Sequence, residues 1–77
     1  MSLHEQRVQE VVHFFNNNDT FLGFRKLLDC VTDTQDMALY NEAIALTDWK
    51  ERNPENTVGL TEKAVALLQK VAAFNVT

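Results

Sequence analysis

Apolar residues recur with the period of an α-helix in four segments of the chain. In the first, about 2–16, they share one helical face: Val8, Val11, Val12 and Phe15. Ser2 followed by Glu5 has the spacing of a capping box, and residues 16–18 are asparagines, which tolerate the left-handed conformation that ends helices. The pattern therefore predicts a helix over about 2–16.

The second segment, about 20–31, has Asp19 as its predicted N-cap. Its apolar face is formed by Phe21, Phe24, Leu27, Leu28 and Val31. Gly23 lies inside it, where glycine costs about 1 kcal/mol relative to alanine. We therefore expect a close contact with another helix at Gly23.

The third segment, about 34–52, carries two apolar stripes instead of one. The first is Met37, Tyr40 and Ile44; the second is Leu39, Ala43 and Leu46, extended by Trp49. Thr32, Asp33 or Thr34 is the expected N-cap, and Asn53 before Pro54 ends the helix. Two stripes predict a helix that is contacted on more than one side.

A loop over 53–59 and a fourth helix over about 60–74, capped by Thr57 or Thr61, complete the pattern. No segment alternates with period two, so the fold class is all-α: one domain over 1–77, a small bundle of three to four helices with short connections. The predicted core is Val8, Val11, Val12, Phe15, Phe24, Leu27, Leu28, Val31, Tyr40, Ile44, Leu67, Leu68 and Val71. Both ends of the sequence suit a domain excised from a longer protein.

Charge and composition narrow the classes of partner. The net charge of −4 disfavours nucleic acid and anionic membranes, which repel an acidic surface. No apolar run approaches the roughly 20 residues of a membrane helix, so we expect no membrane insertion. A single cysteine, Cys30, allows no internal disulfide and suits a reducing compartment, so we expect a cytoplasmic protein.

No grouping of chemically active residues predicts a catalytic, cofactor or metal site. Asp29, Asp33 and Asp36 lack the glycine turn and closing glutamate of a calcium loop, and suit polar helix ends better. His4 and His13 are not spaced as a helical metal pair, and we expect each at the surface or its boundary. Cys30 is expected to be a small buried apolar residue. The chain is therefore not expected to be an enzyme.

Surplus apolar side chains point instead to an interface. Phe14 and Phe15 are adjacent and point about 100° apart on a helix, so both cannot occupy the centre of one stripe. The candidate partner-binding residues are Phe14, Leu22, Arg25, Leu39 and Trp49. The partner would be another protein or a second copy of the chain.

Three stretches carry a resemblance to a known family: Phe24–Cys30, Asp33–Gln35 and Ala43–Trp49. They resemble the short helical region that precedes the nucleotide-binding domain in some bacterial ABC-type transporter ATPases. The chain has no phosphate-binding Gly-x-x-x-x-Gly-Lys-Ser/Thr motif. The resemblance therefore implies an appended accessory domain, with any ATPase activity in another domain of a parent chain.

The sequence thus predicts a non-catalytic helical accessory or protein-interaction domain. The alternative is a small helical DNA-binding or regulatory domain, because three helices with a short turn can present a recognition helix. The acidic net charge disfavours that alternative.

Overall fold

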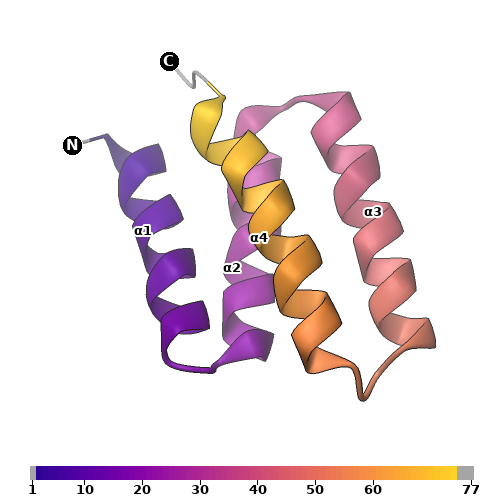
Figure 1. Ribbon diagram of the computed structural model, residues 1–77. Coiled ribbons are helices and arrows are strands. Elements are labelled where there is room, and N and C mark those ends of the chain that lie inside the picture. Colours follow the sequence, from indigo (N-terminus) through magenta and orange to yellow (C-terminus); the bar gives the residue numbers. More distant parts are fainter. Residues whose placement is uncertain (1, 75–77) are drawn as a thin grey trace.

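The computed structural model describes residues 2–74, which form four α-helices and no strand (Figure 1). The helices are α1 (Leu3–Asn16), α2 (Thr20–Thr34), α3 (Met37–Arg52) and α4 (Thr57–Ala73). The predicted all-α bundle with short connections is confirmed. Met1 and residues 75–77 of the predicted domain lie outside the described residues.

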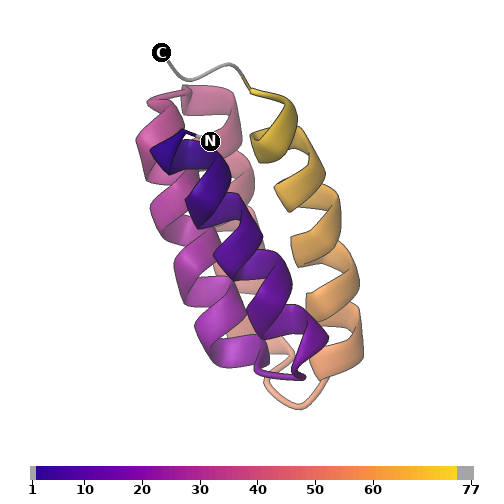
Figure 2. The same ribbon diagram turned by 90° about the vertical axis from the view of Figure 1, so that its left-hand side faces the viewer.

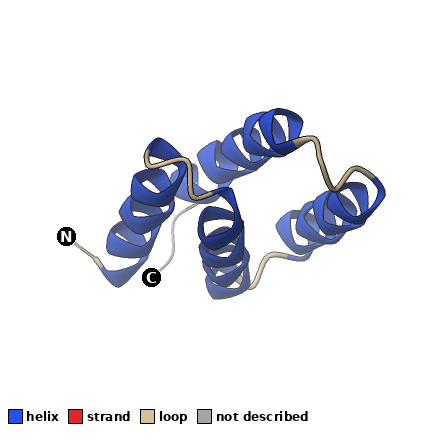
Figure 3. Cartoon of the chain, turned by 90° about the horizontal axis from the view of Figure 1, so that it is seen from below, coloured by secondary structure: helices blue, strands red, loops and turns tan. Residues whose placement is uncertain are grey.

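The bundle is flat, with extents of 36 × 27 × 15 Å. Seen along the helices, α1, α2 and α3 follow one another in a bent row, and α4 lies over one side of it (Figure 3). Helix α4 packs against α2 and α3 and also touches α1, whereas α1 and α3 do not meet. One side of the α2–α3 pair is therefore covered by α4, and the other has no helix over it (Figures 1 and 3).

The first two helices begin where the sequence predicts. The Ser2 hydroxyl accepts a hydrogen bond from the Glu5 amide (3.1 Å), and the Asp19 carboxylate accepts one from the Leu22 amide (3.4 Å). Asn18 adopts a left-handed conformation, with φ of 61°, in the turn between α1 and α2. Each polar side chain thus satisfies an amide that the first turn of a helix leaves unpaired.

The third helix begins at a residue that the sequence pattern did not predict. Asp36, and not Thr32, Asp33 or Thr34, caps α3 by accepting from the Leu39 amide (3.1 Å). The predicted cap was wrong because α2 continues to Thr34 and ends at Gln35, whose φ is 55°.

Helix α4 starts at Thr57, three residues before the predicted Leu60. Its N-cap is Asn56, whose side chain accepts from the Gly59 amide (2.9 Å), in place of the predicted Thr57 or Thr61. The predicted 53–59 loop is therefore shorter, because an asparagine supplies the cap earlier in the chain.

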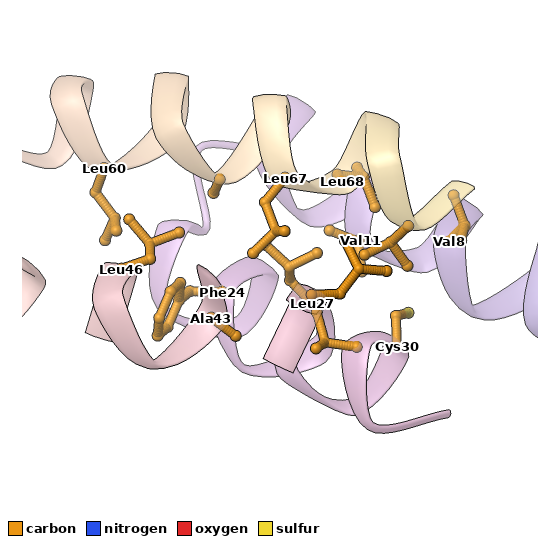
Figure 4. Packing of buried hydrophobic residues seen from close by; sticks show 14 residues of the cluster. Val8, Val11, Phe24, Leu27, Cys30, Ala43, Leu46, Leu60, Leu67 and Leu68 are labelled. Carbon is orange, nitrogen blue, oxygen red and sulfur yellow. The ribbon is translucent and has the colours of Figure 1, made fainter. Parts of the chain in front are cut away.

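A single apolar core joins all four helices (Figure 4). The predicted core residues of α1, α2 and α4 are buried or packed against this cluster. Tyr40 and Ile44 of α3 are 47% and 51% exposed, so their placement in the core was wrong. The second stripe of α3, Leu39, Ala43 and Leu46, is buried in their place. Helix α4 packs on that side of α3, where Leu46 points toward Leu60 (Figure 4).

The close contact predicted at Gly23 is confirmed. A Cβ atom added to Gly23 would lie 2.8 Å from Cε1 of Phe15, so the absence of a side chain lets α1 and α2 pack closely. An ion pair between Arg7 and Asp33 also joins these helices, with a longer one between Lys26 and Glu10 (3.9 Å).

His4 is buried, although the sequence pattern places it at the surface or its boundary. Its Nε2 atom hydrogen-bonds the carbonyl of Val71 (3.1 Å), because the first turn of α1 lies against the last turn of α4 (Figure 2). Cys30 is fully buried, as predicted.

Candidate interaction surface

The five predicted partner-binding residues do not form one patch. Leu22 and Arg25 are exposed on α2, while Phe14 on α1 and Trp49 on α3 are half-buried. Leu39 is only 7% exposed and belongs to the core, because its stripe faces the rest of the bundle. Leu39 therefore offers little surface to a partner.

Trp49 helps to close the junction between α3 and α4. Its ring edge would meet a Cβ added to Gly59 at 2.9 Å, and the Lys63 ammonium lies 5.1 Å from the ring centroid. Trp49 also packs against the buried cluster. Much of its surface is thus already used inside the domain.

An exposed apolar stripe runs along α3, although its Tyr40 and Ile44 were predicted to lie in the core. Met37, Tyr40 and Ile44 have exposures of 68%, 47% and 51%. Their i, i+3, i+7 spacing keeps them on one face of the helix. Sequence periodicity identified the stripe but could not tell that it points outward.

Tyr40 and Ile44 border an open groove between α2 and α3, of about 440 Å³. We call it the α2–α3 groove and define it by its lining: Leu28, Val31, Thr32, Tyr40, Ala43, Ile44, Thr47, Asp48 and Glu51. No residue of α4 lines it, which places it on the side of the α2–α3 pair that α4 leaves uncovered. Exposed apolar side chains and a hollow thus coincide on this side of the bundle.

The hydroxyl groups of the two groove threonines are already used within their own helices. Thr32 donates to the carbonyl of Leu28 (3.0 Å), and Thr47 donates to the carbonyl of Ala43 (2.9 Å). Both threonines therefore add little unsatisfied polarity to the lining.

The charged groups in the lining are carboxylates. Asp48 forms an exposed ion pair with Arg52 (3.0 Å), and Glu51 forms none among residues 2–74. Arg25 lies on α2 one turn before Leu28, but it is not part of the lining. The floor of the groove is thus apolar, and its rim toward the C-terminal end of α3 is acidic.

Two further exposed apolar residues, Phe21 and Val58, lie where α2 and α4 begin. They are 69% and 70% exposed and border a hollow with a more polar lining. The Lys50 ammonium lies 4.9 Å from the Phe21 ring centroid, which covers part of that ring. This second patch offers less continuous apolar surface than the α2–α3 groove.

The residues considered for metal binding or catalysis, Asp33, Asp36 and Cys30, have roles in holding the fold together. Asp36 caps α3 and Asp33 pairs with Arg7, while residues 2–74 hold no cluster of three potential metal ligands. Burial, and after it the Asp33 carboxylate, raises the pKa of the Cys30 thiol to about 11, which disfavours the reactive thiolate. No helix among the described residues has the length and apolar character needed to cross a membrane.

Comparison of the chain with family models, with curated proteins and with solved structures gives no match.

Proposed function

We propose that this chain is a non-catalytic protein-interaction domain that binds its partner in the α2–α3 groove. One observation carries the proposal: α3 has two apolar stripes, and the bundle buries only one of them. Exposed apolar side chains that gather beside a hollow are typical of a docking surface.

The energetics of this surface favour a partner over solvent. Complete burial of a large apolar side chain contributes about 1.5–3 kcal/mol, and Tyr40 and Ile44 keep about half of their surface exposed. Covering these two residues and Met37 would thus contribute a few kcal/mol. A contact of that size suits a regulated or transient complex, because association itself carries an entropic cost.

The setting that we propose is a cytoplasmic accessory domain of an ABC-type transporter ATPase. Its support is the resemblance carried by Phe24–Cys30, Asp33–Gln35 and Ala43–Trp49. Two of these stretches contribute to the α2–α3 groove, through Leu28 on α2 and Ile44 on α3. Any nucleotide hydrolysis would belong to a different domain.

The DNA-binding alternative stays a prediction with less support. The exposed side of α3 carries Asp48 and Glu51 beside its apolar stripe, and these carboxylates would repel a phosphate backbone. Retention on duplex DNA that weakens as salt rises would favour this alternative instead.

The test uses a synthetic amphipathic helical peptide whose apolar residues are leucines and whose polar residues are all glutamine. Titrated into isotope-labelled domain, it should shift the amide resonances of Ala43 and Thr47, and Tyr40→Ser with Ile44→Ser should abolish the shift. The matched control, Phe21→Ser with Val58→Ser, removes two even more exposed apolar side chains elsewhere and should preserve binding. Binding that survives the loss of Tyr40 and Ile44 would refute the proposal.

A further inference from the structure

We infer that the segment bound in the α2–α3 groove is an amphipathic helix with lysine or arginine beside its apolar face. This inference rests on the proposed function and adds the chemistry of the partner. Its support is the shape of the groove, the polar groups that line it and the charge of the chain.

The helical form of the partner follows from what covers the opposite side of the same two helices. There α4 lies against α2 and α3 and buries Leu60, Ala64, Leu67 and Val71, which are spaced i, i+4, i+7 and i+11. On the uncovered side, α2 and α3 likewise form a groove between two helices. Its lining extends along α3 from Tyr40 to Glu51, about 16 Å at 1.5 Å per residue, which matches three turns of a docked helix.

The basic character of the partner follows from which polar groups in the groove lining remain able to bind it. Thr32 and Thr47 use their hydroxyls within their own helices. Glu51 is a carboxylate without an ion pair among residues 2–74, Asp48 shares its charge with Arg52, and the lining contains no cation. A partner with ammonium or guanidinium groups at this rim would form charge-assisted hydrogen bonds, whereas an acidic partner would be repelled.

A second copy of the chain fits this groove less well. Each copy carries a net charge of −4 and presents the same Asp48 and Glu51 beside its exposed stripe. Arg52, the cation next to this rim, is already paired with Asp48. If two copies paired through this groove, their apolar stripes would meet, but carboxylates of the same sign would also come close together and repel each other.

The experiment compares three helical peptides that share the apolar spacing of α4 and differ only beside the apolar face: lysine, glutamine or glutamate. Binding is measured by titration calorimetry, and the site is mapped by the amide resonances of Ala43 and Thr47. The lysine peptide should bind tightest and the glutamate peptide weakest. Asp48→Asn with Glu51→Gln removes both carboxylates and leaves Arg52 unpaired at the rim, so it should weaken the lysine peptide about tenfold and remove its advantage over the other two.

The matched control is Glu5→Gln with Glu62→Gln, which removes the same net charge from exposed positions on α1 and α4. It should leave the preference for the lysine peptide intact. An equal loss in this control would show a general charge effect and overturn the assignment to the groove rim.

The remaining outcomes separate the two proposals. If all three peptides bind the groove with equal affinity, the interaction domain stands and its basic partner is overturned. If none of the three shifts the groove resonances, both proposals fall.

Discussion

The absence of a side chain at Gly23 sets how closely α1 and α2 approach each other. Alanine would raise helix propensity by about 1 kcal/mol, but its Cβ would meet the Phe15 ring at 2.8 Å. Overpacking of this kind costs about 1–3 kcal/mol. We therefore expect Gly23→Ala to lower the free energy of unfolding by about 1 kcal/mol in urea denaturation.

The Phe15→Leu background supplies the control for this prediction. Removing the ring relieves the contact, so Gly23→Ala should be neutral or stabilising there, and the two substitutions should not be additive. If Gly23→Ala stabilises the unaltered protein by the full propensity difference, the ring does not constrain this site. The contact was predictable from the sequence because a glycine inside an apolar helix weakens that helix unless the missing side chain permits closer packing.

Cys30 makes the free energy of unfolding depend on pH at the alkaline end. Burial, and after it Asp33, raises the pKa of the thiol from 9.0 to about 11, while the nearby Arg7 opposes the rise. The folded protein then holds the proton more tightly than the unfolded chain. The thiol therefore makes its full contribution to the free energy of unfolding below pH 9. The free energy of unfolding falls by about 2 kcal/mol as the pH rises to about 11.

Urea denaturation of the unaltered protein and of Cys30→Ala at several pH values checks this prediction. The unaltered protein should lose more stability over this pH range than the alanine variant, whatever their difference at neutral pH. Equal slopes would mean that other groups carry the alkaline transition. Alkylation of Cys30 near pH 8 should likewise follow unfolding, since the native thiol is buried.

Among the elements, α3 is the one whose orientation the sequence could not decide. Helices α1, α2 and α4 have one dominant apolar face each, and burying that face leaves little choice. Helix α3 has two faces of similar apolar character, and the choice between them depends on where α4 packs. Tyr40 and Ile44 were predicted to lie in the core, but Leu39, Ala43 and Leu46 are the α3 residues that the bundle buries.

The two stripes of α3 should respond differently to substitution. Leu46→Ala should lower the free energy of unfolding by about 2–4 kcal/mol, because it leaves a cavity in the core. Ile44→Ser should lower it by only about 1 kcal/mol, because about half of that side chain is already exposed. Thermal and urea denaturation followed by circular dichroism measure both. Comparable losses for the two variants would mean that both stripes are packed within the domain.

Helix boundaries depend on local hydrogen bonds that several nearby residues could have made. The segment from Thr32 to Asp36 holds four residues able to cap a helix, and Asp36 is the one whose carboxylate accepts the Leu39 amide. Asp36→Ala should lower the free energy of unfolding by about 1 kcal/mol. Asp36→Asn keeps a cap of similar strength and should be near neutral. A large loss in Asp36→Asn would show that the charge matters more than the hydrogen bond.

At the scale of the whole molecule, the sequence predicted the class of fold but not its arrangement. Periodicity gives the faces of the helices, whereas the bent row of α1, α2 and α3 with α4 on one side depends on contacts between distant residues. His4 and Val71 illustrate this, because their hydrogen bond joins the first turn of α1 to the last turn of α4. The exposed groove is a consequence of that arrangement, so no local pattern could have located it.

The oligomeric state provides the last prediction. An exposed apolar stripe favours self-association, but identical faces that each carry Asp48 and Glu51 oppose it. We expect light scattering to report a monomer over a wide range of concentration. Raising the salt concentration screens the repulsion between carboxylates and leaves the apolar attraction, so a monomer at high salt as well would mean that the stripe is too small to pair with itself. A dimer that Ile44→Ser abolishes and Phe21→Ser preserves would instead assign the α2–α3 groove to a second copy of the chain.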